Sequence, residues 1–193
     1  MTEDATSKPA LRARALAARA ALPSTARAAA SATIRDRPRA LPELETAGRV
    51  LGYAAFGDEV DLDPLLAQLI ADGVAVHLPY VEPAGIAVAR VADLADLTTG
   101  YRGVREPPAG SRRPAAVEEL DVALVPGVAF DHRGGRLGYG GAHFDRLLAR
   151  MRPGAARIGV AFSAQMLEEI PVEPHDVRLD MVVTEGGNLR VAG

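Results

Sequence analysis

The segment "LDVALVPG" (residues 120–127) constrains the fold most, because an unbroken apolar run extends from Val122 to Val125. A strand with one face in water alternates apolar and polar residues, whereas a continuous apolar run is typical of a strand buried on both faces. Strands of that kind belong to sheets that helices cover on both sides. The segment therefore predicts a layered α/β protein around a central sheet.

Other segments supply further strands and helices for this sheet. Apolar runs predict strands at residues 49–56, 74–80, 85–91, 156–162 and 179–185. Between the first two, "DLDPLLAQLIADG" repeats leucine at helical spacing and ends at Gly73, with Asp61 as the expected N-cap. The alternation predicts a three-layer α/β/α fold with a mostly parallel central sheet. Ligands of such sheets gather beyond the carboxyl ends of the strands.

Two helices are expected ahead of the sheet. Apolar residues fall at helical spacing from Leu11 to Leu22, and Pro23 then interrupts the pattern. A second helix follows with Ser24 as its expected N-cap. We expect an N-terminal helical hairpin, joined to the sheet in a single domain of residues 1–193.

Composition excludes several classes of function. The net charge of −3 and the 4% aromatic content disfavour a general nucleic-acid or anionic-membrane binder. The absence of cysteine excludes disulfides, a thiolate nucleophile and cysteine-ligated metals. The sequence contains no apolar run long enough to span a bilayer, and its start lacks a signal-peptide core. We therefore expect a cytoplasmic protein with small-molecule partners, and a monomer.

The stretch "GRLGYGGAHFDRLL" (residues 135–148) places four glycines ahead of an aspartate and an apolar run. Glycine loses more conformational entropy on folding than other residues, so such a cluster needs a reason. It completes a loop at residues 127–141, a length that is uncommon without a function. The residues alone leave two interpretations open: turns, or a backbone that approaches phosphate.

A helix is expected to begin at Ala142 or His143. Its apolar face consists of Phe144, Leu147, Leu148 and Met151. Free amides at a helix start favour anions, and Arg133 and Arg136 add positive charge nearby. Asp145 has two interpretations, as a charge that complements the helix dipole or as a Mg²⁺ ligand facing the same phosphates.

The stretch "VPGVAFDHRGGRLGYGGAHFDRLLAR" resembles the signature of the 5-formyltetrahydrofolate cyclo-ligase family, also called 5,10-methenyltetrahydrofolate synthetase. Three other blocks fit the family in the same order. They are the N-terminal Lys8 with Leu11 and Arg12, the segment "FGDEVDLDPLL" with Glu59, and a closing block that holds Gln165, Pro171, Glu173 and Asp176 in register. This chain departs from the family at Ala142, His143 and Phe144, where Gly-Tyr-Tyr is usual.

The resemblance implies an ATP-dependent enzyme that cyclises 5-formyltetrahydrofolate to 5,10-methenyltetrahydrofolate and releases ADP and phosphate. In that mechanism the formyl oxygen attacks the γ-phosphate, and N10 then closes the ring as phosphate departs. The resemblance assigns catalytic roles to Lys8, Arg136 and Asp145. It assigns ATP contacts to Lys8, Leu11, Arg12, Arg136, Leu137, Gly138, Tyr139, Gly140, Gly141, Ala142, His143 and Phe144. It assigns folate contacts to Ala54, Glu59, Tyr139, Gly140, Gly141, Ala142 and His143, and Mg²⁺ to Asp145 and Asp176.

Several residues keep simpler interpretations beside these roles. Lys8 and Arg12 can be interpreted simply as charged side chains in solvent. Asp176 and Asp180 can both be turn or capping residues, and of the two Asp176 is favoured as the metal contact. Gln165 fits a cap or a ligand contact. The irregular stretch at residues 97–113 carries two further residues expected near the folate, Tyr101 and Arg105.

Three rival functions remain open at this level. Asp131–His132 and His175–Asp176 are two His–Asp pairs of a kind that can form a hydrolytic metal site. A diverged relative that binds folate or nucleotide without turnover is the second rival. The third is a sugar-phosphate isomerase or acyl-transferase relative with a similar core, which a fold-level argument does not exclude.

Overall fold

The computed structural model describes residues 5–83 and 85–191; the first residues of the segment assessed for a signal peptide lie outside these ranges. The helices of the described part are α1 (Lys8–Ala20), α2 (Ser24–Arg39), α3 (Pro42–Glu45), α4 (Asp63–Ala71) and α5 (His143–Leu148). None of them is long and apolar enough to cross a bilayer.

A seven-stranded sheet forms the centre, in the order β12-β11-β9-β6-β1-β2-β3. Its strands are β1 (Arg49–Leu51), β2 (Ala75–Glu82), β3 (Gly85–Arg90), β6 (Val122–Val125), β9 (Ala156–Val160), β11 (Met181–Thr184) and β12 (Gly187–Arg190). The five inner strands pair in parallel, and β3 and β12 add antiparallel edges. This arrangement confirms the predicted mostly parallel sheet.

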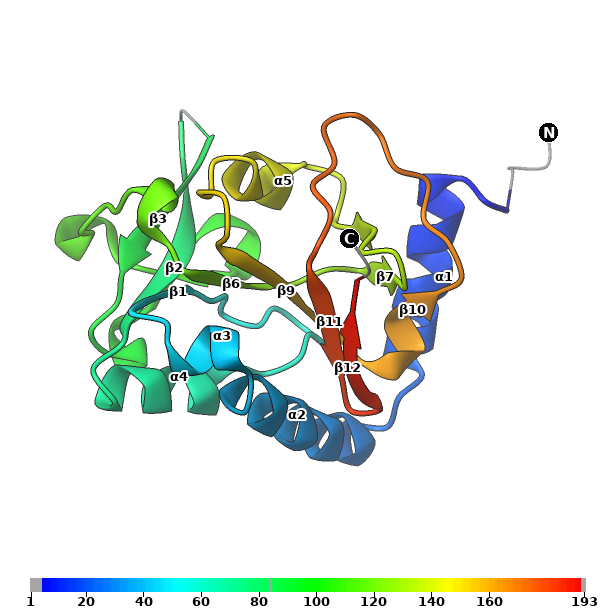
Figure 1. Ribbon diagram of the computed structural model, residues 1–193, viewed down its shortest axis with the longest axis horizontal. Coiled ribbons are helices and arrows are strands. Elements are labelled where there is room, and N and C mark those ends of the chain that lie inside the picture. The colour runs from blue at the N-terminus through cyan, green and yellow to red at the C-terminus, as the bar shows by residue number, and fades with distance from the viewer. Residues whose placement is uncertain (1–4, 84, 192–193) are drawn as a thin grey trace.

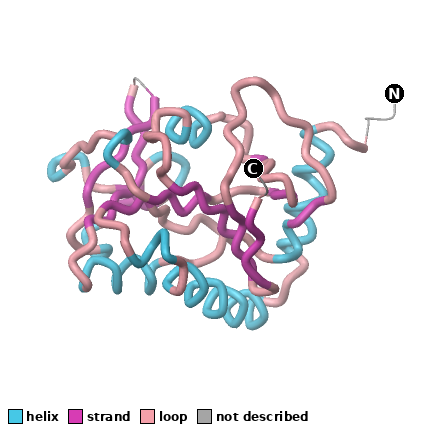
Figure 2. The backbone as a smooth tube through the Cα atoms, viewed as in Figure 1, coloured by secondary structure: helices cyan, strands magenta, loops and turns pink. Residues whose placement is uncertain are grey.

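Helices cover the sheet on both faces, as the apolar run in β6 predicts (Figure 1). Val122 and Leu124 of β6 belong to the core beneath α2, α3 and α4. Ala123 and Val125 point the other way, into the core that contains Leu147 of α5. Figure 2 shows that helices line one side of the sheet, whereas loops and the short α5 cover the other. The three-layer prediction is therefore confirmed, although one of the outer layers consists mostly of loops.

The chain leaves the sheet centre in opposite directions from β1 and β6. From β1 it proceeds through α4 to β2 and β3, and from β6 it proceeds to β9, β11 and β12. Loops after two adjacent strands that diverge in this way open a crevice at the carboxyl ends of the strands. The topology thus places a ligand site between the loops that follow Leu51 and Val125.

The predicted loop at residues 127–141 is wrong in part, because it contains two short strands. These are β7 (Ala129–Asp131) and β8 (Arg136–Leu137), which form a small sheet with β10 (Met166–Leu167). Gln165 ends the 3₁₀ helix η5 (Ser163–Gln165), where its side chain accepts from Phe162 N and donates to the carbonyls of Gly127 and Val128. The bond from Phe162 N makes Gln165 a cap of η5, and the other two bonds tie this turn to the segment after β6.

The second small sheet and two 3₁₀ turns lie in the stretch expected to be irregular, residues 97–113. The pair β4 (Thr98–Thr99) and β5 (Arg105–Glu106) closes a short hairpin around η2 (Tyr101–Gly103). The remaining turns are η1 (Leu94–Asp96), η3 (Ala109–Ser111) and η4 (Val117–Glu119). This hairpin extends over the carboxyl end of β2, where it brings Tyr101 close to the crevice.

Both N-terminal helices form, but they pack mainly against different sheets. Helix α1 lies against β7 and η5, whereas α2 lies along the large sheet beside α4 (Figure 1). Ser24 is the first helical residue rather than the N-cap, because Pro23 takes that position. Asp61 likewise precedes the N-cap Leu62 of α4, although its carboxylate accepts a hydrogen bond from Asp63 N at 3.0 Å.

Asp131 fastens the small sheet to the C-terminal part of the chain. Its side chain is buried, and its two carboxylate oxygens accept from Arg133 N (2.8 Å), Gly135 N (2.7 Å) and Ile170 N (2.8 Å). These bonds compensate for burial of the charge and close the β7–β8 turn. Asp131 therefore has a structural role.

We predict that Asp131→Ala lowers the free energy of unfolding by about 2–4 kcal/mol, because three backbone donors lose their acceptor. Glu169→Ala is the control, since it removes only an exposed ion pair to Arg133 and is expected to cost less than about 0.5 kcal/mol. Urea denaturation of both variants measures the difference. Equal stability of the two variants would contradict the structural role of Asp131.

Candidate functional site

A cleft of about 710 Å³ opens where the topology places it, at the carboxyl ends of β1, β2 and β6. It is lined by every residue of the predicted site except Leu11: Lys8, Arg12, Ala54, Glu59, Arg136, Leu137, Gly138, Tyr139, Gly140, Gly141, Ala142, His143, Phe144, Asp145 and Asp176. Tyr101 and Arg105 line it as well. Leu11 instead packs in a small core with Val128 and Leu137. The structure therefore brings together residues from both ends of the chain.

The segment from Gly138 to Ala142, here called the glycine loop, presents a run of unused amides. Within the described ranges, none of its backbone N–H groups donates to another protein group. Gly140 has a φ of +99°, and Ala142 has a φ of +48°, so two of its residues adopt left-handed conformations. Consecutive amides in such turns form concave sites for anions. Helix α5 has only six residues, so its dipole is small. The loop amides therefore contribute more to anion binding here than the helix dipole does.

A buried ion pair links the two ends of this loop. Arg136 Nη2 lies 2.8 Å from Asp145 Oδ2, and the two side chains are 3% and 11% exposed. Arg136 Nη1 also donates to the carbonyl of Pro126, at the end of β6, and its Nε is buried without a partner. The guanidinium is thus fixed at the cleft wall with one donor unused.

A second ion pair joins the first helix to the C-terminal segment. Lys8 Nζ lies 2.7 Å from Asp176 Oδ2 and 3.2 Å from Glu173 Oε2. Partial burial opposes the charged form of Lys8, but the bonds to both carboxylates outweigh it and raise the pKa of the ammonium. For Asp176, burial acts to raise the pKa of the carboxyl, but the bonds from Lys8 and Glu173 N outweigh it and lower the pKa. Both groups are therefore charged at neutral pH.

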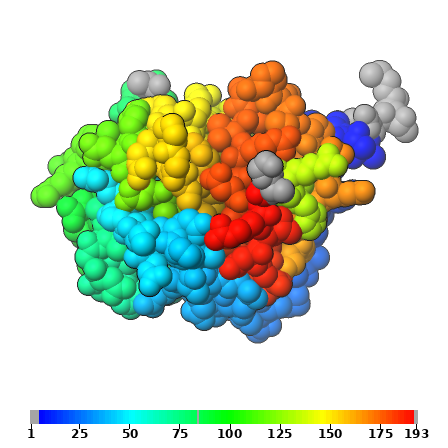
Figure 3. Space-filling model, in the orientation of Figure 1, coloured from blue at the N-terminus to red at the C-terminus, as the bar shows by residue number. Residues whose placement is uncertain are grey.

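The predicted metal ligands lie on adjacent elements. Asp145 Oδ1 accepts from Val177 N at 3.4 Å, so the loop that carries Asp176 lies against α5, as the molecular surface also shows (Figure 3). In the described part of the chain, Glu173, His175 and Asp176 form the one cluster of three possible metal ligands. Both aspartates are neutralised by cations in this state, Asp145 by Arg136 and Asp176 by Lys8.

Helix α1 holds the glycine loop through two arginines. Arg12 Nε donates to the carbonyl of Gly138 at 2.8 Å, and Arg19 Nη2 donates to the hydroxyl of Tyr139 at 2.9 Å. The two arginines are seven residues apart, which is two helical turns, so both reach the same side of α1. Arg12 is thus a support of the loop backbone as well as a cleft residue.

Glu59 also lines the cleft, in the loop after β1. Its Oε2 accepts from Phe56 N at 3.0 Å. Burial raises the pKa of this carboxyl, while the Phe56 amide, Arg19 and the Tyr139 hydroxyl oppose the rise. A half-buried carboxylate next to a cleft can accept paired bonds from an amino-pyrimidine edge.

An aromatic rim surrounds the mouth of the cleft. Phe56, Tyr101 and Tyr139 are large apolar side chains that remain 42%, 49% and 51% exposed, and all three line the cavity. Exposed aromatic groups gathered at one cavity are typical of a site for a flat ring. His143 lies nearby, and burial together with the charges of Arg146 and Arg102 lowers the pKa of its imidazole.

Several cleft residues carried no recognised sequence signal. Phe56 and Arg102 lie in stretches without periodicity, so nothing in the pattern distinguished them. Arg19 could have been found, because it follows Leu11 and Ala15 at intervals of four on the buried face of α1. A cation on the apolar face of a helix is therefore a sequence signal for a residue of this kind.

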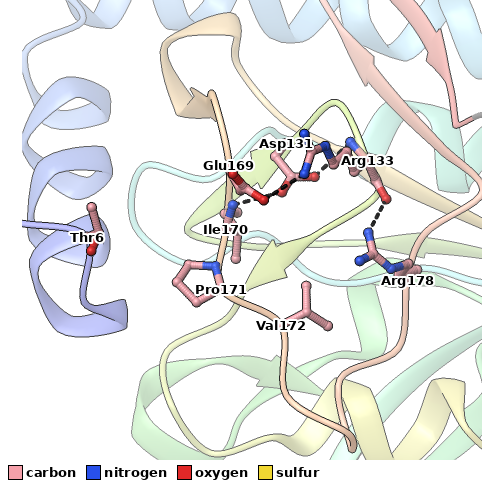
Figure 4. A pocket seen from close by; sticks show the side chains of 8 residues that line it. All are labelled: Thr6, Asp131, Arg133, Glu169, Ile170, Pro171, Val172 and Arg178. Carbon is pink, nitrogen blue, oxygen red and sulfur yellow. Dashed lines mark hydrogen bonds and ion pairs between the residues drawn. The ribbon is translucent and has the colours of Figure 1, made fainter.

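A separate cavity of about 390 Å³ lies beside β7 (Figure 4). Its polar groups mostly bond one another: Arg133 pairs with Glu169, Arg178 Nη1 donates to the Arg133 carbonyl, and Asp131 is saturated as described. The metal-ligand cluster at His175 includes neither Asp131 nor His132. The two pairs proposed for a hydrolytic metal site are therefore not assembled among the described residues.

Comparisons with known proteins agree along most of the chain. The model of the 5-formyltetrahydrofolate cyclo-ligase family matches residues 4–185. The 5-formyltetrahydrofolate cyclo-ligase of Mycolicibacterium smegmatis is 36% identical over 150 residues, covering 75% of this chain and 77% of that protein. The enzyme of the same name from Escherichia coli strain K12 is 33% identical over 147 residues, with coverage of 74% and 81%. The NMR structure of Aquifex aeolicus 5,10-methenyltetrahydrofolate synthetase matches with a TM-score of 0.85 and 34% identity, over 96% of this chain and 93% of that one.

We predict that Ala142→Gly raises the free energy of unfolding by about 0.5 kcal/mol. Glycine removes the strain of a left-handed alanine, and the greater conformational entropy of glycine in the unfolded chain offsets part of this gain. Ala149→Gly is the matched control at the other end of α5, where the backbone is right-handed, and it should lower stability by a similar amount. Urea denaturation compares them. If both changes destabilise equally, Ala142 is not left-handed in solution.

Proposed function

This chain belongs to the 5-formyltetrahydrofolate cyclo-ligase family, and from that premise we propose how its cleft carries out the reaction. The enzyme is an ATP-dependent ligase that converts 5-formyltetrahydrofolate to 5,10-methenyltetrahydrofolate. One observation carries the assignment of roles. The glycine loop, whose amides donate to no other group of the described residues, lines a cleft that also holds several basic side chains, among them Lys8, Arg12 and Arg136.

The terminal phosphates of ATP bind at the glycine loop in this proposal. Loop amides supply hydrogen-bond donors, and the guanidinium of Arg136 adds a positive charge at the cleft wall. Lys8 can leave its carboxylates for a phosphate without changing its charge. Phosphoryl transfer depends on positioning and charge neutralisation rather than on a covalent nucleophile, which suits a chain without cysteine.

The reduced folate binds beside the glycine loop, at the part of the cleft that Glu59 and the aromatic rim line. Glu59 accepts hydrogen bonds from the amino-pyrimidine edge of the pterin, and the aromatic rim packs against its ring. This arrangement directs the N5-formyl group toward the glycine loop. Residues from different parts of the chain therefore align the formyl group of the folate with the phosphate of ATP for an in-line attack.

The reaction then balances in two steps. The formyl oxygen forms a bond to the γ-phosphorus as the bond to the ADP oxygen breaks, and Arg136 and Lys8 neutralise the transferring group. N10 next bonds to the formyl carbon, phosphate leaves with the oxygen, and the N10 proton is released. The chain's residues position both steps and exclude water from the phosphate intermediate.

Asp145 and Asp176 fit a Mg²⁺ site, because carboxylates on adjacent elements beside a phosphate loop are the ligands that this ion prefers. When bound, Mg²⁺ would neutralise the β- and γ-phosphates. The same two carboxylates are paired with Arg136 and Lys8 in the structure. We propose that these cations turn to the phosphates when the carboxylates turn to the metal.

The remaining assignments belong to the same proposal. The cleft draws on both Lys8 and Asp176, which favours one domain over residues 1–193. The exposed large apolar side chains of the described residues line the two cavities, which favours a monomer without nucleic-acid or membrane partners. A cytoplasmic location suits a reaction that consumes ATP.

We predict that Asp145→Asn lowers kcat at least about 100-fold, because the amide is a poor Mg²⁺ ligand and the phosphates lose their alignment. Asp180→Asn is the control, since this exposed acid lies outside the cleft. The assay follows ADP release and the near-ultraviolet absorbance of the methenyl product. Circular dichroism verifies that both variants fold. Wild-type protein that binds folate without turnover would instead support the non-catalytic alternative.

A second prediction concerns pH. Because the pKa of Glu59 is raised, its carboxylate is lost as pH falls through a value above the ordinary one, and KM for the folate should rise there. Glu59→Gln should raise KM about tenfold at neutral pH and remove this pH dependence. Glu168→Gln, at an exposed position outside the cleft, is the control. A pH profile of KM that is identical in Glu59→Gln and wild type would contradict the role of Glu59.

A further inference from the structure

Arg19 is a buried cation that the proposed reaction does not use. Its side chain is on the buried face of α1, and the residue is 5% exposed. The ion pairs of the described residues do not include its guanidinium, and its Nη1 is buried without a hydrogen-bond partner. A buried charge without a paired carboxylate is costly, so its presence calls for a specific role.

Arg19 contacts the cleft through Tyr139. Its Nη2 donates to the Tyr139 hydroxyl at 2.9 Å, while the tyrosine ring remains half exposed in the cleft wall. Glu59 lines the same cavity as Tyr139, near enough for the Arg19 charge and the Tyr139 hydroxyl to oppose the rise in the pKa of its carboxyl. One hydrogen bond thus joins Arg19 to Tyr139, and Tyr139 shares the cavity with Glu59; these three residues are here called the Arg19 relay.

The Arg19 relay includes residues from both proposed substrate sites, Tyr139 of the glycine loop and Glu59 of the loop after β1. Tyr139 is flanked by Gly138 and Gly140, so its position depends on the conformation of the glycine loop. Glu59 lies in the part of the cleft assigned to the folate. A change of the glycine loop is thus transmitted to Glu59 by a side chain of that loop.

We propose that Arg19 and Tyr139 are positioning residues that couple nucleotide binding at the glycine loop to folate binding at Glu59. This inference rests on the proposed function and names the order of events at the same site. With phosphate on the loop amides, Tyr139 is held against Arg19, and its hydroxyl orients the Glu59 carboxylate for the pterin. Without nucleotide the Arg19–Tyr139 bond is already formed and the ends of the loop are fixed, but no phosphate restrains Tyr139 and Glu59 from moving.

Arginine suits this role better than lysine. Its guanidinium stays charged when buried and its planar donors are fixed in direction, whereas a buried lysine loses its charge readily. The free Nη1 leaves a second donor that a purely structural arginine would have satisfied. An exposed arginine on the same helix, Arg14, supplies a matched control.

The test measures folate affinity with and without a non-hydrolysable ATP analogue. In wild-type protein the analogue should tighten the binding of 5-formyltetrahydrofolate at least about fivefold. Tyr139→Phe keeps the ring and removes the hydroxyl. In this variant the affinity for the folate should be about the same with and without the analogue. In turnover, KM for the folate should rise about tenfold, with kcat changed less than about threefold.

The arginine variants extend the test. Arg19→Met should abolish the enhancement, Arg19→Lys should retain part of it, and Arg14→Gln should leave it intact. A purely structural role for Arg19 would lower stability and leave the enhancement in Tyr139→Phe unchanged, which overturns the proposal. Equal folate affinity with and without the analogue in wild-type protein overturns it too. Wild-type protein without turnover would refute the proposed function, and the coupling proposal with it. If wild-type protein turns over and the analogue tightens folate binding equally in Tyr139→Phe, only the coupling proposal is refuted.

Discussion

The buried ion pair between Arg136 and Asp145 is the interaction on which the rest of the site depends. It joins β8 to the first turn of α5 and thereby fixes both ends of the glycine loop. Removing either partner would leave an unpaired charge in the protein interior. With its ends fixed, the loop can leave its backbone amides without protein partners and still keep one conformation. The pair therefore maintains a binding surface that is ready before any ligand arrives.

The site also depends on the topology of the large sheet. Because the chain diverges from β1 and β6, the loops after these strands separate and leave room for a cleft. Helix α1 and the segment around Asp176 close its sides, although they lie at opposite ends of the sequence. Arg12 and Arg19 attach the glycine loop to α1, so the first helix is a support for the site rather than an appendage.

Much of this arrangement could be predicted from the sequence, where patterns are long. The apolar run in β6 correctly indicated a sheet covered on both faces, and the leucines of α4 indicated its helix. The β7–β8 hairpin was missed because strands of two or three residues carry no periodicity. Leu11 was assigned to the nucleotide by its place in a motif, whereas the structure packs it in a core. Arg19 was not predicted because the helical pattern is defined by apolar residues, and a cation at the same spacing adds nothing to that pattern.

The central claim is that the amides of the glycine loop bind the phosphates of ATP. Amide NMR spectra of the isotope-labelled protein, recorded during titration with MgATP, test this claim most directly. The account predicts that the resonances of Gly138, Gly140 and Gly141 shift strongly and saturably, while that of Gly154, which lies outside the cleft, stays in place. Saturable binding of MgATP that leaves these three resonances unchanged would contradict it.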